Sequence, residues 1–281
     1  MYKLVLGFAL APLWALAQIP AIHQETVPTD ARVQLFQEWV TADPASVGNR
    51  TLLAGAFLQK TRETNDFGYL DRASKLVDQV LQQKPDYEAR RLRSMIELTR
   101  HQFRTAADHA RELTASVPSD PQNWGVLGDA LLEMGQYPEA HTAFQKMVAL
   151  RPSLFSYNRL AYFRFLTGDV EGAISMMRDA VKAGAEFPEN KAWCLVELGH
   201  LYFKTGNIEA AQAAYSEAAA TFPALHSSYA GLGSIAAASG DAARAVEFYK
   251  HAQAISPMVQ YAGVLHDLYT ALGKTTEAKQ Q

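Results

Sequence analysis

The sequence predicts an all-α protein, an α-solenoid built from stacked helical hairpins. Two observations predict it: apolar residues recur at helical spacing in short segments, and one template returns about every 34 residues along most of the chain. Long runs of β-branched residues are missing. The 281 residues are 48% hydrophobic and 20% charged, which is the balance of a globular protein that can bury a core.

The clearest hairpin lies in the middle of the chain. Trp124, Leu127 and Leu131 fall at i, i+3 and i+7 and form one apolar face of a helix. Gly135 can adopt the left-handed conformation that ends this helix. Pro138 suits the first turn of the second helix, where its missing N–H costs nothing. We expect a buried Trp124, whose replacement by alanine would cost about 3–5 kcal/mol.

The N-terminus has a different composition. Residues 1–17 contain Lys3, a short apolar run and the small residues of Ala15-Leu16-Ala17, so we expect a secretory signal peptide that is cleaved before Gln18. The run is shorter than the ~20 residues of a membrane span. The alternative is an uncleaved N-terminal anchor, which would be the only membrane attachment. Residues 18–28 are expected to be a linker.

The remaining chain is expected to form a cap helix and a series of hairpins. Thr29 or Asp30 would begin the cap helix, whose apolar face includes Trp39. The first hairpin has a longer first helix, and the second has no glycine in its turn at His101. Polar residues after a turn glycine are expected to cap second helices: Asp169, Asn207 and Asp241. The expected elements are the cap helix 29–42, units of about 45–86, 87–120, 121–153, 154–191, 192–225 and 226–258, and a partial unit 259–281.

The recurring pattern of W-x2-L-G, G-x-Y, A-x3-F and P resembles the tetratricopeptide repeat. The residues that carry the resemblance are Trp124, Leu127, Gly128, Gly135, Tyr137, Ala140, Phe144 and Pro152. The resemblance covers nearly everything from about residue 30 onward. It implies a right-handed α-solenoid that works as a protein-interaction scaffold, without catalytic residues, cofactor or small-molecule substrate.

The resemblance also implies which residues face the concave groove, because the first helix of each unit lines it. In units 154–225 these are Phe155, Asn158, Tyr162, Phe165, Trp193, His200, Phe203 and Lys204. In the second unit they are Glu88, Arg91, Met95 and Leu98. We predict that the aromatic wall of units 154–225 binds a protein or peptide partner. The alternative is that tight curvature buries these aromatics against the neighbouring helix.

Charge and motifs favour no other class of function. Basic and acidic residues nearly balance, 26 against 29, which does not indicate nucleic-acid binding. The eight histidines and the single Cys194 form no metal-ligand or catalytic motif, so no metal site is expected. The sequence therefore predicts an exported, periplasmic or secreted, non-catalytic scaffold. The alternative is a structural subunit or assembly factor of an envelope complex that uses its convex face or self-association.

Overall fold

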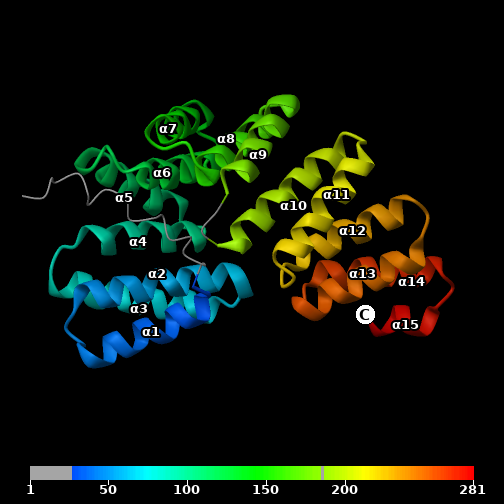
Figure 1. The fold of residues 1–281 in the computed structure, drawn as a ribbon, viewed down its shortest axis with the longest axis horizontal. Helices are drawn as coiled ribbons and strands as arrows, with labels where there is room; N and C mark the ends of the chain where they lie inside the picture. The colour runs from blue at the N-terminus through cyan, green and yellow to red at the C-terminus, as the bar shows by residue number, and fades with distance from the viewer. Residues whose placement is uncertain (1–26, 185–186) are drawn as a thin grey trace, which may run out of the picture.

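The computed structural model describes residues 27–184 and 187–281, which form fifteen helices and no strand (Figure 1). The expected signal peptide and most of the expected linker lie outside the described residues. The helices are α1 (Thr29–Ala42), α2 (Val47–Thr64), α3 (Phe67–Gln83), α4 (Tyr87–Thr99), α5 (Phe103–Ser116), α6 (Pro121–Glu133), α7 (Tyr137–Leu150), α8 (Leu154–Leu166), α9 (Val170–Ala183), α10 (Pro188–Lys204), α11 (Ile208–Thr221), α12 (His226–Ala238), α13 (Ala242–Ile255), α14 (Val259–Ala271) and α15 (Thr275–Gln280).

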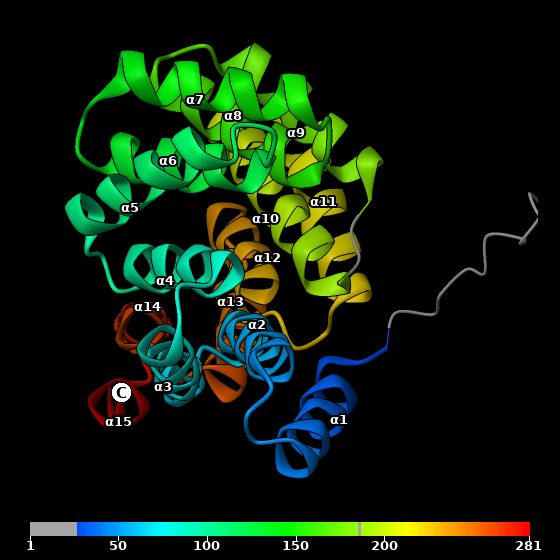
Figure 2. The ribbon, with the colours of Figure 1, turned by 90° about the vertical axis from the view of Figure 1, so that its left-hand side faces the viewer.

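Successive helices pack as antiparallel pairs, and the pairs stack, so the predicted all-α solenoid is confirmed. The stack winds around an axis, and in Figure 2 the helices α1–α3 and α7–α9 lie on opposite sides of it. Each pair buries an apolar face against the next pair, which is how a solenoid forms a continuous core. None of the described helices is long and apolar enough to cross a membrane.

The turns between paired helices use left-handed backbone. Five turn glycines have φ between +70° and +89°: Gly135, Gly168, Gly206, Gly240 and Gly273. In two hairpins a residue other than glycine takes this conformation: Asn65 after α2 with φ of 56° and His101 after α4 with φ of 58°. Asparagine and histidine tolerate it better than a β-branched residue does. The predicted caps are confirmed, because Asp169, Asn207 and Asp241 each accept a backbone N–H of the following helix.

Glycine on the first helix of a pair makes room for an aromatic ring on the second. A Cβ at Gly128 would lie 2.4 Å from Phe144 Cε1, and one at Gly199 would lie 2.5 Å from Tyr215 Cε1. Tyr215 also covers Gly231 of the next unit, where a Cβ would again lie 2.5 Å from its ring. One buried ring therefore joins two units.

Three details differ from the sequence expectations. Trp124 is only half-buried, because its indole Nε1 reaches the surface to donate to the Pro118 carbonyl over 2.9 Å. The expected cost of its removal is therefore too high. Thr29 does not cap α1; its buried hydroxyl donates instead to Glu63 on α2. Trp39, which was expected on the apolar face of α1, is 41% exposed.

The first helix of the first pair is longer than the others, as predicted: α2 has 18 residues, whereas α4, α6 and α8 have 13 each. Its additional C-terminal turns reach the start of α10. Gln59 Nε2 donates to Glu189 Oε2 over 3.3 Å, and Arg62 Nε lies 3.8 Å from the same oxygen. We call this the closing contact, because it joins residues 130 positions apart across the superhelix.

Candidate functional site

The concave side of the solenoid contains an inner cavity of about 430 Å³. Its wall comes from α1 and from the first helices of the first four pairs, together with Met147 of α7 and Phe187 in the connection before α10. Apolar side chains such as Leu58, Met95 and Val126 form much of it. Four arginines also line the cavity, Arg32, Arg62, Arg91 and Arg159, against one carboxylate, that of Glu88.

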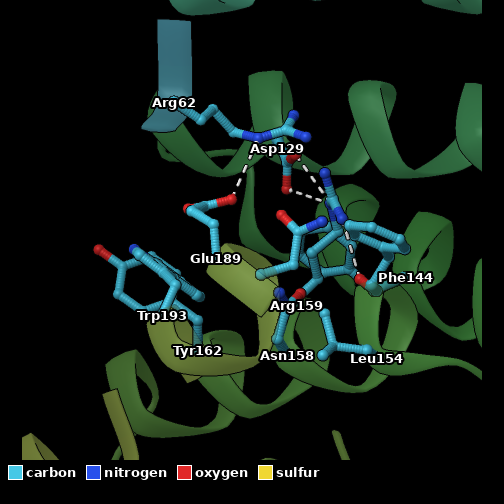
Figure 3. Close-up of a pocket in the computed structure, with 11 residues that line it drawn as sticks. Arg62, Asp129, Phe144, Leu154, Asn158, Arg159, Tyr162, Glu189 and Trp193 are labelled. Atoms are coloured by element: carbon cyan, nitrogen blue, oxygen red, sulfur yellow. Dashed lines mark hydrogen bonds and ion pairs between the residues drawn. The ribbon is translucent and has the colours of Figure 1, made fainter. Parts of the chain in front are cut away.

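A second, side cavity of about 260 Å³ adjoins the first and shares Arg62, Phe155 and Arg159 with it. Three of its aromatic side chains are exposed: Phe155 to 39%, Tyr162 to 42% and Trp193 to 39%. In Figure 3, Tyr162 and Trp193 lie on the opposite side of this cavity from Arg159 and Asp129. The side cavity thus combines an aromatic wall with a charged wall.

Asp129 holds Arg159 in the charged wall. Arg159 Nε donates to both carboxylate oxygens of Asp129, over 3.0 Å and 2.8 Å, and Nη1 donates to the Phe155 carbonyl over 2.9 Å. Burial raises the pKa of Asp129, while Arg159 opposes that rise. Since the guanidinium is bonded on two sides, its orientation in the cavity is fixed.

The position of Asp129 within its repeat explains why its carboxylate bonds to Arg159. His200 and Ser234 follow the helix-packing glycines of their units and lie within hydrogen-bond distance of a tyrosine hydroxyl, that of Tyr215 at 2.7 Å and that of Tyr249 at 2.8 Å. Asp129 follows Gly128 in the same way, but the ring that packs there belongs to Phe144 and has no hydroxyl. Asp129 therefore bonds to Arg159 of the next unit instead.

The start of α10 supplies the rest of the polar wall. Burial raises the pKa of Glu189, and Arg62 opposes the rise. Burial is the main cause that lowers the pKa of Arg62. Nevertheless 44% of the Arg62 side chain is exposed to solvent, because the residue lies on the wall of an open, concave channel. Asn190 is only 6% exposed, and its Nδ2 has no hydrogen-bond partner among the described residues.

A family model described as "Tetratricopeptide repeat" matches residues 126–190 and 196–257. These segments cover four of the helix pairs, at least in part. These residues, just under half of the chain, are similar to tetratricopeptide repeats. No curated protein sequence matches the chain.

Solved structures share the fold of this chain at low sequence identity. A chain of the APC/C hetero-tetramer Cut9-Hcn1 matches with a TM-score of 0.64 and 16% sequence identity. The match covers 85% of the present chain but only 46% of the solved one. A tetratricopeptide repeat protein from Parabacteroides merdae matches with a TM-score of 0.61 and 14% sequence identity. The match covers 86% of the present chain and 92% of the solved one. PilW, a type IV pilus biogenesis factor, matches with a TM-score of 0.61 and 15% sequence identity. That match covers 69% of the present chain and 89% of PilW.

The residues predicted to line the groove of the central tetratricopeptide repeats separate into two groups. Phe155, Asn158, Tyr162 and Trp193 line the side cavity together. The other four, Phe165, His200, Phe203 and Lys204, lie outside both cavities. Lys204 Nζ lies 4.5 Å from the Phe165 ring centroid, and Phe165 and Phe203 pack against the core. Burial lowers the pKa of His200, whose ring bonds to Tyr215 rather than to a ligand.

The sequence analysis did not select the four charged residues of the side cavity or its buried amide: Arg62, Asp129, Arg159, Glu189 and Asn190. A comparison of the repeats could have found Asp129, because Phe144 stands where units 192–225 and 226–258 have Tyr215 and Tyr249. Arg159 pairs with Asp129 of the neighbouring unit. Arg62, Glu189 and Asn190 come together through the closing contact, for which the local repeat pattern contains no signal. Of the groove residues predicted in the second unit, Glu88, Arg91 and Met95 line the inner cavity, whereas Leu98 packs against the core.

Among residues 27–184 and 187–281, no group of three or more His, Cys, Asp and Glu side chains could hold a metal ion. Cys194 is buried beside Asn158, and burial raises the pKa of its thiol to about 12. Its thiol is therefore protonated at neutral pH and is a poor nucleophile.

Glu197, also on α10, is expected to make stability depend on pH. Burial raises its pKa to about 6, above its ordinary value of 4.5, and Lys204 opposes the rise. The folded state therefore favours the protonated carboxyl, and ionisation weakens the fold as the pH rises from about 4.5 to above 6. Glu197→Gln should raise the free energy of unfolding by up to about 2 kcal/mol at neutral pH and by nothing near pH 4. Urea unfolding at both pH values checks this; an equal gain at both would contradict it.

Proposed function

We propose that the protein is an exported, non-catalytic scaffold that binds a peptide segment of a protein partner in its concave groove. The observation that carries the proposal is the inner cavity, with the exposed aromatic side chains of the side cavity next to it. Apolar and aromatic side chains that remain open to solvent on a concave surface are typical of binding sites. The groove therefore has the composition of an interface before any partner is bound.

The shape of the two cavities favours an extended or helical peptide over a folded domain. They have volumes of about 260 and 430 Å³, which suit inserted side chains rather than a flat surface. Arginine and large aromatic residues are the types that contribute most to protein–protein affinity. Export rests on the signal-peptide pattern of residues 1–17, and the absence of catalysis rests on the general role of the repeat.

A pair of substitutions at Gly55 tests the proposal. Gly55 lines the inner cavity, and a Cβ at this position would meet no atom within 4 Å. Gly55→Trp should therefore fill part of the cavity without displacing the helices, whereas Gly55→Ala should leave the cavity open. Random short peptides displayed on phage and selected on the full chain provide the ligands.

We expect the selected peptides to bind the wild-type chain and Gly55→Ala equally, and Gly55→Trp at least about tenfold more weakly, the equivalent of about 1.4 kcal/mol. Thermal melts of both variants confirm that they fold. Equal binding to Gly55→Trp, or no enriched peptide, would reject the groove as the binding site. Sedimentation velocity tests the alternative: a concentration-dependent oligomer would favour self-association as the working state.

A further inference from the structure

Two carboxylates adjoin the aromatic wall of the side cavity. Trp193 and Glu197 are one helical turn apart on α10, so they lie on the same face of that helix. Tyr162 of α8 lies on the same side of the cavity as Trp193 (Figure 3). Burial is the main cause that raises the pKa of the Tyr162 hydroxyl, and the carboxylates of Glu133 and Glu197 raise it further, so both lie close enough to act on it. We call these four residues the acidic aromatic cluster.

The carboxylates of the acidic aromatic cluster have no donor of their own. Within the part of the chain that the structure describes, the side chain of neither Glu133 nor Glu197 forms a hydrogen bond or an ion pair. Lys204 opposes the rise in the pKa of Glu197, but its Nζ lies 4.5 Å from the centroid of the Phe165 ring and makes no ion pair with that carboxylate. Because Glu197 is half-buried, a missing donor there costs free energy that a bound cation would recover.

The arginines of the side cavity do not neutralise these carboxylates. Each lies within ion-pair distance of a carboxylate of the same cavity, at 2.8 Å for Arg159 and Asp129 and at 3.8 Å for Arg62 and Glu189. The lining of the side cavity is thus balanced within itself. Lys204, the basic residue that acts on Glu197, offsets at most one of the two carboxylates of the acidic aromatic cluster. The cluster therefore keeps a negative charge, which favours a cation beside the aromatic wall.

We infer that the acidic aromatic cluster binds a lysine or arginine side chain of the partner. The inference rests on the proposed function and specifies its ligand. A cation is attracted to the face of an aromatic ring, most strongly to tryptophan, and the rings of Tyr162 and Trp193 are 42% and 39% exposed. The two carboxylates would add charge-assisted hydrogen bonds to the same cation. Lys204 over the ring of Phe165 is a contact of this kind within the chain itself.

The composition of the selected peptides tests this inference. The probe is the random phage-displayed library already described, selected on the full chain. We expect enrichment of lysine or arginine at one position of the peptides. The best peptide is then synthesised with its basic residue and with norleucine at that position, which keeps an apolar stem and removes the charge. Loss of the cation should weaken binding at least about tenfold, as measured by fluorescence anisotropy.

Substitutions in the protein then locate the cation. The double variant Glu133→Gln, Glu197→Gln keeps the shape of both side chains and removes their charge, and Trp193→Leu keeps an apolar side chain and removes the ring. Each should weaken the basic peptide about fivefold or more and leave the norleucine peptide unchanged, because the two peptides differ only in the cation. The matched control is Glu209→Gln, an exposed glutamate of α11 that lines neither cavity. Thermal melts check that each variant folds.

The outcomes separate the two proposals. Peptides without basic enrichment, or basic and norleucine peptides that bind equally, would overturn the inference. If Gly55→Trp still weakened binding in that case, the groove would remain the binding site with a different ligand. Variants of the cluster that bind the basic peptide like the wild type, or that weaken both peptides equally, would also overturn the inference. Preference for the basic peptide with full binding to Gly55→Trp would support the cluster and reject the inner cavity. A library that yields no binder at all would reject both the ligand and the groove.

Discussion

Replacing Tyr215 with alanine is expected to lower the free energy of unfolding by about 3–5 kcal/mol, the range for large buried aromatic residues. Tyr215 is among the largest fully buried side chains. Its ring packs on Gly199 of its own unit and on Gly231 of the next, so its loss leaves a cavity at the boundary between two units. Urea unfolding followed by circular dichroism measures the change.

Tyr215→Phe is the matched control, because it keeps the ring and removes only the hydroxyl that lies 2.7 Å from His200 Nδ1. The control should cost about 0.5–1.5 kcal/mol. If alanine and phenylalanine cost the same, ring packing would not be what joins the units. An unfolding transition that splits into two steps for Tyr215→Ala would show directly that the contact couples neighbouring repeats.

The same glycine-to-alanine substitution is expected to have opposite effects at two positions on first helices. At Gly128, a Cβ would lie 2.4 Å from Phe144, so Gly128→Ala must displace a fully buried ring and should cost about 1–3 kcal/mol. At Gly55, a Cβ meets no atom within 4 Å. Gly55→Ala should therefore stabilise the helix by about 0.5–1 kcal/mol, since alanine restricts the unfolded chain more than glycine does.

Both glycine variants are measured by urea unfolding under the same conditions, and each serves as the control for the other. Phe144→Leu in the Gly128→Ala background should recover part of the lost stability, because the smaller side chain makes room for the methyl group. A Gly128→Ala variant as stable as the wild type would mean that the two helices can separate freely. That result would contradict the close packing on which the hairpin depends.

The fold could be predicted from the sequence because its signals are local. Each hairpin needs a periodic apolar face, a left-handed turn and small residues at the crossing, and all three lie within one repeat of the sequence. His101 shows the limit of the turn signal, since a histidine occupies the left-handed position with φ of 58°. Trp124 shows the limit of the apolar signal, because a large side chain at the right spacing can still reach the surface.

The candidate site could be predicted only in part, because half of it is not local. The aromatic wall comes from first helices at regular positions, so the repeat pattern pointed to Phe155, Tyr162 and Trp193. Arg62 lies near Glu189 and Asn190 only because α2 and α10 meet, and no periodicity encodes a contact over 130 residues. The superhelical curvature sets that contact, and it arises from the sum of many small packing angles between units.

The closing contact has a consequence for the order of folding and opening. Every hairpin can form from neighbouring residues, whereas Gln59 and Glu189 must close a loop of 130 residues, which makes their contact late and entropically costly. It is also small, with one hydrogen bond and one longer ion pair. Local fluctuations should therefore break it before any hairpin unfolds. Such a local opening would let the middle of a long polypeptide enter the superhelix from the side. Neither end of that polypeptide would have to pass through the channel.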